Sequence, residues 1–189
     1  MTTPAGVLRA ADHVRMPWAN GGGTTYQVAT WPAGSTLDTF DWRVSLADID
    51  EGGPFSAFPG VDRILVLVEG PGMELAIDDR VVPLAPREPV RFDGSAVTSC
   101  VLTHGPTRDL NVMTRRGRCT ATLDVVDVAD RLEVAPDHGW TVLVVVLGGE
   151  VEVGGAVAQR LGPRDALVAD RGLELAGPGA LALIRIRPA

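Results

Sequence analysis

Short apolar segments, separated by Gly, Pro and Asp, recur along the whole chain and predict an almost entirely β structure. Val, Ile and Leu dominate these segments, which are interrupted about every eight to twelve residues, a spacing typical of sandwiches and barrels. No segment keeps a 3.6-residue apolar period for long enough to predict a helix. The expected strands lie at residues 42–46, 64–68, 75–77, 97–102, 142–147 and 181–186.

Two stretches of the chain resemble each other at a nearly constant offset. Residues 63–75 and 141–153 both run from an apolar strand through glycines into a second, alternating strand, at an offset of 78 residues. Residues 84–88 (Leu-Ala-Pro-Arg-Glu) match residues 161–165 (Leu-Gly-Pro-Arg-Asp) at an offset of 77. A nearly constant offset across separate matches indicates a duplicated structural unit.

This repeat unit resembles the cupin barrel. The resemblance implies an all-β bicupin, with two cupin-like β-barrels in one chain. The expected division places one barrel in residues 1–117 and the other in residues 118–189, within one compact unit whose barrels could exchange strands.

The positions that hold metal ligands in metal-binding cupins carry other residues here. Such cupins place a His-x-His pair and a Glu before the first strand of the unit, and a further His after its turn. Phe55 and Phe58 stand near the first position, and residues 86–92 contain no His. Only His138 lies near the equivalent place in the second half, whereas a stable zinc or iron site needs three or four converging ligands. We therefore expect neither a metal nor another cofactor.

Period-two alternation places charged residues on one face of several expected strands. Around Arg43, the residues Trp42 and Val44 share an apolar face, while Arg43 and Ser45 share the opposite, polar face. Arg63 begins an otherwise apolar strand, where a long cation often buries its stem and frees its head.

Later in the chain the same alternation places Asn111, Met113 and Arg115 on one face, with Met113 expected in the core. Asp109, which follows Gly105-Pro106, is interpreted as a turn residue.

Residues 16–31 combine a glycine triplet with a large aromatic residue and an amide. Trp18 and Asn20 precede Gly21, Gly22 and Gly23, and a strand-like run follows. Three glycines have a real entropic cost, which indicates that a ligand or another part of the chain approaches the backbone closely there. From the triplet alone, a β-bulge or hairpin crossing is the favoured explanation.

The overall charge excludes some partners. The chain has 189 residues, 46% of them hydrophobic, a net charge of −7 and an isoelectric point near 4.9. An acidic protein of this kind is unsuited to nucleic acid or to an anionic membrane surface. No signal peptide is visible, and the longest apolar run, residues 142–147, is far too short to span a membrane. We expect a cytoplasmic protein.

Two omissions narrow the chemistry further. All 17 basic residues are Arg, so Schiff-base chemistry and a P-loop lysine are excluded, whereas fork-like recognition of carboxylates is favoured. The chain contains only two cysteines, Cys100 and Cys119, which we interpret as reduced thiols.

Four blocks, in the right order, make the chain resemble the HutD/Ves family. They are residues 16–25 (Met-Pro-Trp-Ala-Asn-Gly-Gly-Gly-Thr-Thr), residues 40–45 (Phe-Asp-Trp-Arg-Val-Ser), residues 53–63 and residues 105–117. The resemblance implies a bicupin fold and an association, in some members, with bacterial histidine utilisation. It also implies that the protein moderates this pathway by binding a metabolite of the urocanate or formylglutamate type.

From the residues we predict a ligand-binding mouth on the N-terminal barrel. Arginine forks would pair with a carboxylate while aromatic walls and amides complete the pocket. The residues expected to converge there are Trp18, Asn20, Arg43, Ser45, Phe55, Phe58, Arg63, Asn111 and Arg115. The expected partner is a small anionic metabolite, and we expect a binding protein and modulator rather than an enzyme.

Two alternatives remain open. A carboxylate pair drawn from Asp41, Asp62 and Glu69 could serve a metal-independent isomerase or hydrolase acting on a small carboxylate. A triad of Ser45, His104 and Asp109 has no support from spacing. The protein could also be an interaction module that pairs subunits through the edges of residues 142–147 and 173–186, so either a monomer or a homodimer is expected.

Overall fold

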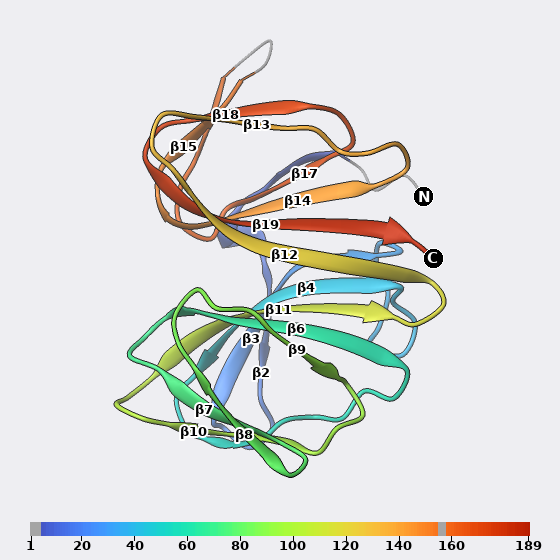
Figure 1. Cartoon of the computed structure of the whole chain (residues 1–189), viewed down its shortest axis with the longest axis vertical. Helices are drawn as coiled ribbons and strands as arrows, with labels where there is room; N and C mark the ends of the chain where they lie inside the picture. The colour runs from blue at the N-terminus through green and yellow to red at the C-terminus, as the bar shows by residue number, and fades with distance from the viewer. Residues whose placement is uncertain (1–4, 155–157) are drawn as a thin grey trace. The chain divides into compact units, whose positions relative to one another are not determined.

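The computed structural model describes residues 5–154 and 158–189, and this part of the chain is built almost entirely of β-strands (Figure 1). One short 3-10 helix, Ala10–Asp12, is present. No helix within the described residues is long and apolar enough to cross a membrane. The strands are β1 (Gly6–Leu8), β2 (Val14–Pro17), β3 (Gly23–Trp31), β4 (Trp42–Ile49), β5 (Gly53–Pro54), β6 (Val61–Glu69), β7 (Met73–Ile77), β8 (Arg80–Leu84), β9 (Val90–Asp93), β10 (Thr98–Leu102), β11 (Thr107–Arg115), β12 (Cys119–Val128), β13 (Arg131–Val134), β14 (Thr141–Gly149), β15 (Val151–Val153), β16 (Gln159–Leu161), β17 (Ala166–Ala169), β18 (Leu173–Ala176) and β19 (Gly179–Pro188).

The chain divides into two compact units. Val14–Arg118 forms one unit, here called the N-terminal barrel. The residues through His13, together with Cys119–Ala189, form the other, here called the C-terminal barrel. The division near residue 118 lies next to the expected boundary, but the first thirteen residues belong to the later barrel. They do so because β1 pairs antiparallel with β17.

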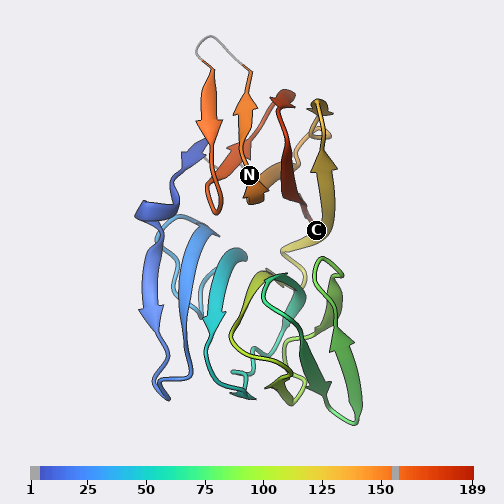
Figure 2. The same cartoon turned by 90° about the vertical axis from the view of Figure 1, so that its left-hand side faces the viewer.

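The N-terminal barrel consists of two sheets. One has the strand order β2-β3-β4-β11-β6-β9, and the other the order β5-β10-β7-β8. The neighbouring strands β2, β3 and β4 are the blue to cyan arrows that run side by side in Figure 2. All pairings between its named strands are antiparallel.

The C-terminal barrel repeats this topology. Its sheets have the orders β1-β17-β14-β19-β12 and β13-β18-β15-β16. Strands β12 to β19 therefore reproduce the connections of β4 to β11 in sequence order, each shifted by eight strand numbers. The duplicated unit expected from the sequence is thus present, and the fold is of the cupin type.

The turn after β8 and the turn after β16 show the repeat at atomic detail. Arg87 and Arg164 both adopt a left-handed backbone, with φ of 74° and 72°. Their amides donate to Leu67 O at 2.8 Å and to Val146 O at 2.7 Å. Leu67 is therefore equivalent to Val146, an offset of 79, so strand β6 aligns with β14 one residue later than the sequence match indicates.

Each barrel has its own apolar core. In the N-terminal barrel, Leu65, Leu67, Leu75 and neighbouring residues pack between the sheets. In the C-terminal barrel, Val144 and Leu183 belong to a larger buried apolar cluster. The alternation predicted around Arg43 is present, because Trp42, Val44 and Leu46 occupy one face of β4 and are almost fully buried. This arrangement leaves the side chains of Arg43 and Ser45 to point to the other face, into the N-terminal barrel.

Candidate functional site

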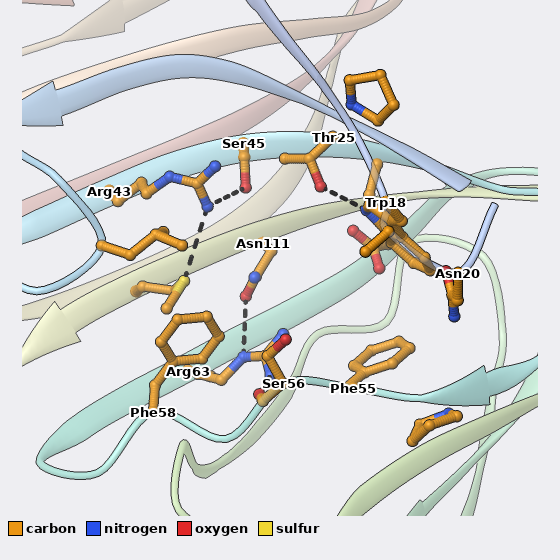
Figure 3. Close-up of a pocket in the computed structure, with 17 residues that line it drawn as sticks. Trp18, Asn20, Thr25, Arg43, Ser45, Phe55, Ser56, Phe58, Arg63 and Asn111 are labelled. Atoms are coloured by element: carbon orange, nitrogen blue, oxygen red, sulfur yellow. Dashed lines mark hydrogen bonds between the residues drawn. The ribbon is translucent and has the colours of Figure 1, made fainter. Parts of the chain in front are cut away.

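A cavity of about 470 Å³ opens into the N-terminal barrel (Figure 3). Strands β3, β4, β6 and β11 supply its floor, and the loops around residues 17–20 and 54–58 supply its walls. Its lining comprises Pro17, Trp18, Ala19, Asn20, Thr25, Leu37, Arg43, Ser45, Ala47, Pro54, Phe55, Ser56, Phe58, Arg63, Asp109, Asn111 and Met113. Eight of the nine predicted site residues therefore lie around one cavity.

Arg43 is held in the cavity floor by neutral partners. The residue is 5% exposed, and its guanidinium donates through Nε to Gln27 Oε1 at 2.9 Å and through Nη1 to Ser45 Oγ at 3.2 Å. Nη1 also lies 4.0 Å from Met113 Sδ. Burial lowers the pKa of Arg43, because desolvation penalises the charged form.

Arg63 is held by an amide and by aromatic rings. Its Nε donates to Asn111 Oδ1 at 3.4 Å and its Nη1 to Ser56 O at 3.5 Å. The guanidinium carbon lies 5.5 Å from the ring centre of Phe55 and 5.7 Å from that of Phe58. Burial lowers its pKa to about 10, nearby Arg43 lowers it as well, and Asp109 opposes the shift.

A third ring, that of Phe92 in β9, lies 4.9 Å from the same guanidinium carbon. Contacts of a cation with aromatic faces contribute only about 0.5–2 kcal/mol each and leave hydrogen-bonding positions free. The three rings therefore fix the plane of the Arg63 guanidinium without neutralising its charge.

Neither guanidinium has an ion-pair partner within the described residues. No carboxylate lies within 4 Å of Arg43 or Arg63 in the described residues, although several other arginines there pair with carboxylates. In each of the two, Nη2 donates to no acceptor in the described part of the protein. Burying a charge without a counter-ion costs free energy. An anion bound beside the two guanidiniums would reduce this cost.

Asp109 is a pocket residue that the sequence interpretation missed. It lies in β11, not in a turn, and is only 3% exposed. Its Oδ1 atom is buried without a hydrogen-bond partner in the described structure. Burial raises the pKa of this carboxyl to about 7, against the opposing effect of Arg63 and with a further increase from Asp48. The signal was available, because Asp109 precedes Asn111 by two residues and so shares its face of the strand.

The glycine triplet shapes the wall that carries Trp18. Gly21 adopts a φ of +76°, and a Cβ added at Gly23 would collide with the backbone oxygen of Asp48 and press on the Trp18 ring. Trp18 Nε1 donates to Thr25 Oγ1 at 2.8 Å, and the Trp18 ring meets Phe55 edge-on at 6.3 Å. The close approach inferred from the triplet is therefore made by the chain itself, in the hairpin between β2 and β3.

Arg115 does not belong to the cavity, contrary to expectation. It lies at the end of β11, where Nε donates to Phe40 O at 2.9 Å and Nη2 to Asp38 O at 3.0 Å. Its guanidinium also covers the Phe40 ring at 5.1 Å. These contacts direct the side chain to the loop before β4, so its role is to anchor that loop.

The carboxylates considered for catalysis lie outside the cavity lining. Asp62 pairs with Arg116 at 2.8 Å, and Glu69 pairs with Arg108 at 2.5 Å. Asp41 is approached by Arg118 at 4.0 Å. In the formal triad, Ser45 and Asp109 line the cavity, but His104 is exposed and does not. Asp109 is thus the one acidic side chain in the lining.

The cavity lining does not suit a metal ion. Within the described residues, no three His, Cys, Asp or Glu side chains gather in a way that could hold a metal. The lining supplies one carboxylate, while two guanidiniums repel a cation. Phe55 and Phe58 contribute rings instead of imidazole ligands, and both rings contact Arg63.

Comparison with known proteins places the chain in a family. The HutD family model matches residues 10–183. The chain belongs to the HutD family. It is 41% identical over 174 residues to an uncharacterized 21.2 kDa protein in the hutC 3′ region of Pseudomonas putida, covering 90% of each chain. Protein Ves of Citrobacter koseri is 40% identical over 121 residues, which are 61% of this chain and 62% of Ves.

Solved structures of the same family support the fold. HutD from Pseudomonas fluorescens SBW25, described for a formate condition, matches with a TM-score of 0.84 and 37% identity, covering 98% of this chain and 100% of that one. The conserved protein PA5104 from Pseudomonas aeruginosa matches with a TM-score of 0.90 and 31% identity over the same shares. The resemblance to the HutD/Ves family is therefore confirmed.

More distant structures show the cupin-type fold alone. Ylba from Escherichia coli has a TM-score of 0.73 at 10% identity, and it covers 97% of this chain and 90% of its own. The bacterial pirin YhhW from Escherichia coli, solved with nickel(II), has a TM-score of 0.72 at 9% identity and covers 98% and 100%. At these identities the comparison shows a shared β-barrel architecture alone.

Proposed function

We propose that this HutD-family protein binds a small anionic metabolite in the N-terminal barrel. The observation that carries the proposal is the pair of buried guanidiniums, Arg43 and Arg63, which share a cavity and lack a carboxylate within 4 Å in the described residues. Arginine forks bind carboxylates with two parallel hydrogen bonds, and each of these arginines keeps Nη2 free of protein acceptors there. The cavity volume of about 470 Å³ lies in the usual range for small ligands, roughly 300–1,000 Å³.

The walls favour a ligand with a flat or extended body. Trp18, Phe55 and Phe58 offer ring surfaces beside the arginines, and aromatic faces pack well against planar groups. The Pseudomonas putida relative lies in the hutC 3′ region, and another relative is named HutD. These associations support a metabolite of histidine breakdown, of the urocanate or formylglutamate type, as the ligand. The protein then acts as a sensor that modulates histidine utilisation.

A thermal-shift screen tests this function. The candidate ligands are histidine, urocanate, formiminoglutamate, N-formylglutamate and formate. A ligand at about a hundred times its dissociation constant adds roughly 2.7 kcal/mol of stability. At roughly 2–4 °C per kcal/mol, the melting temperature should rise by about 5–10 °C.

Two variants locate the binding site. Arg43→Met should abolish the ligand-induced shift, because it removes one of the two guanidiniums. Arg115→Met is the matched control: it should keep the full shift, while its lost backbone contacts lower the starting stability by about 1 kcal/mol. Absence of a shift with every ligand, or an equal shift in Arg43→Met, would count against the proposed site.

A second candidate is a metal-independent enzyme acting on a small carboxylate. Asp109 favours it, because a buried carboxyl with a pKa raised to about 7 is suited to proton transfer near neutral pH. Product analysis by NMR on the same ligands would decide between the two functions. Turnover that is lost in Asp109→Asn would establish the enzyme, and unchanged ligands after long incubation would leave binding alone.

A further inference from the structure

Asp109 lines the ligand cavity and carries a buried hydrogen-bond acceptor that has no partner in the described structure. Asp109 is only 3% exposed, and it lines the same cavity as the two arginines. Its Oδ1 is without a partner in the described structure, although nearby Asn111 and Ser45 bind the arginines. A buried acceptor that has lost water and gained no donor destabilises the protein, and the effect is larger when the acceptor is charged.

The charges of the lining residues indicate which ligand would offset this unfavourable burial. Arg43 and Arg63 bring two positive charges, and an ionised Asp109 brings one negative charge. One carboxylate group of a ligand would bring the summed charge of these groups to zero. A ligand that also carries an N–H or O–H group can satisfy Oδ1 at the same time.

We infer that Asp109 determines specificity in this pocket by accepting a hydrogen bond from an N–H or O–H of a ligand whose carboxylate binds Arg43 and Arg63. This inference rests on the proposed function, and it narrows the ligand class. The preferred ligand is a small carboxylate with a hydrogen-bond donor elsewhere in the molecule. A carboxylate of the same shape without the donor leaves Oδ1 unpaired and binds more weakly.

The same contact makes binding depend on pH. The ionised carboxylate of Asp109 accepts a stronger hydrogen bond from the ligand than the protonated carboxyl does. Its charged neighbours are Arg43 and Asp48 on β4 and Arg63 on β6. Across the barrel, Cys100 on β10 is also influenced by Asp109, and its pKa is raised.

Asp48 pairs with Arg108, both arginines remain charged between pH 6 and pH 8, and the raised pKa of Cys100 keeps its thiol protonated there. Because only the ionised form of Asp109 binds in full, the apparent affinity falls with the ionised fraction. With the pKa of Asp109 at about 7, a donor-bearing carboxylate should bind about tenfold more tightly at pH 8 than at pH 6.

Matched ligand pairs test the inference by isothermal titration calorimetry on the full chain. One pair is 3-(pyrrol-2-yl)acrylate and 3-(2-furyl)acrylate, which differ by a ring N–H against a ring oxygen. The other pair is N-formylglutamate and glutarate, which differ by the formamido group. The two acrylates do not change charge between pH 6 and 8, so any pH dependence within that pair belongs to the protein.

In the wild-type protein, the donor-bearing member of a pair should bind at least tenfold more tightly at pH 8, and this advantage should shrink at pH 6. In Asp109→Leu, which has no acceptor at this position, the advantage should fall below threefold and the pH dependence should disappear. The comparison within the wild type does not depend on how well the variant folds.

The outcomes separate this inference from the proposed function. Equal affinity for both members of each pair, without pH dependence, would overturn the role of Asp109 and leave the anion site intact. Binding by neither member of either pair at millimolar concentration would overturn the anion site itself, and the role of Asp109 with it.

Discussion

The two barrels share one strand topology, but several equivalent interior positions are polar in the N-terminal barrel and apolar in the C-terminal barrel. Strand registers align Arg63 with Val142 and Asn111 with Leu183, because Leu67 and Val146 occupy equivalent places in the turn hydrogen bonds. By the same registers, Asp109 aligns with Leu181. In the C-terminal barrel these positions belong to one buried apolar cluster. In the N-terminal barrel they line a cavity.

The difference shows that the polar residues of the N-terminal barrel are not needed for the fold. A barrel with the same strand order folds around Val and Leu at the equivalent positions, and apolar burial stabilises it by about 25 cal/mol for each Å². Buried charges at these positions instead cost free energy. Residues that cost stability at equivalent places in a duplicated fold are best explained by ligand binding.

The largest expected effect comes from introducing an arginine into the C-terminal barrel, at the position equivalent to Arg63. Val142→Arg buries a guanidinium among apolar side chains that offer no amide and no ring stack like those around Arg63. An uncompensated buried charge should lower the free energy of unfolding by about 4 kcal/mol or more, as measured by urea denaturation. Gln159→Arg, at an exposed position of the same barrel, should cost less than about 0.5 kcal/mol. A loss below about 1 kcal/mol in Val142→Arg would show that the two interiors tolerate charge alike.

The next effect is the pH dependence that Asp109 gives to the stability of the free protein. Its folded pKa is raised from 3.8 to about 7, so its contribution is fully present below about pH 4 and is lost as the pH rises through 7. At about 1.4 kcal/mol for each pKa unit, the loss amounts to about 4 kcal/mol. Asn does not titrate, so the stability of Asp109→Asn relative to the wild type should increase by up to this amount between pH 4 and pH 8. Urea denaturation at both pH values measures it, and a constant difference would contradict the raised pKa.

The smallest effect is the reverse exchange in the N-terminal barrel. Arg63→Met removes a buried charge that has no ion-pair partner in the described residues and keeps most of its volume. The free energy of unfolding should stay the same or rise by about 1–2 kcal/mol, while ligand-induced stabilisation disappears. On the same strand, Leu65→Ala should instead lose about 2–5 kcal/mol, because it removes apolar core contacts. A destabilisation of Arg63→Met as large as that of Leu65→Ala would mean that Arg63 is structural.

Strand alternation was sufficient to predict much of the site. It assigned Arg43 and Ser45 to the polar face of β4, and Arg63 and Asn111 to neighbouring strands, because side chains alternate strictly along a strand. The same rule put Arg115 on the face of Asn111 and led us to expect it in the cavity, but Arg115 is not among the lining residues. Alternation gives the face but not the position along the barrel axis, and Arg115 lies at the strand end, where backbone carbonyls of Asp38 and Phe40 accept its hydrogen bonds.

Other features depend on contacts that no local pattern specifies. Gln27 reaches Arg43 through a bulge between Gln27 and Ala29, which shifts the register of β3 against β4. Ser56 and Leu37 enter the cavity from loops, whose paths follow from tertiary packing. Asp109 was assigned to a turn because Gly105-Pro106 precedes it, yet β11 begins at Thr107. Its unpaired oxygen could be recognised only once the whole barrel was assembled.

The pairing of strand β1 also affects folding during synthesis and the design of truncated fragments. Gly6 pairs with Val168, and Arg9 forms an ion pair with Asp165 across a separation of 156 residues. On the ribosome these first residues emerge long before their partner strand exists, whereas every strand of Val14–Arg118 finds its neighbours within that segment. The N-terminal barrel can therefore fold during synthesis, whereas β1 can pair only after β17 has been made. A fragment starting at Cys119 would lack β1 and would therefore expose the unpaired edge of β17.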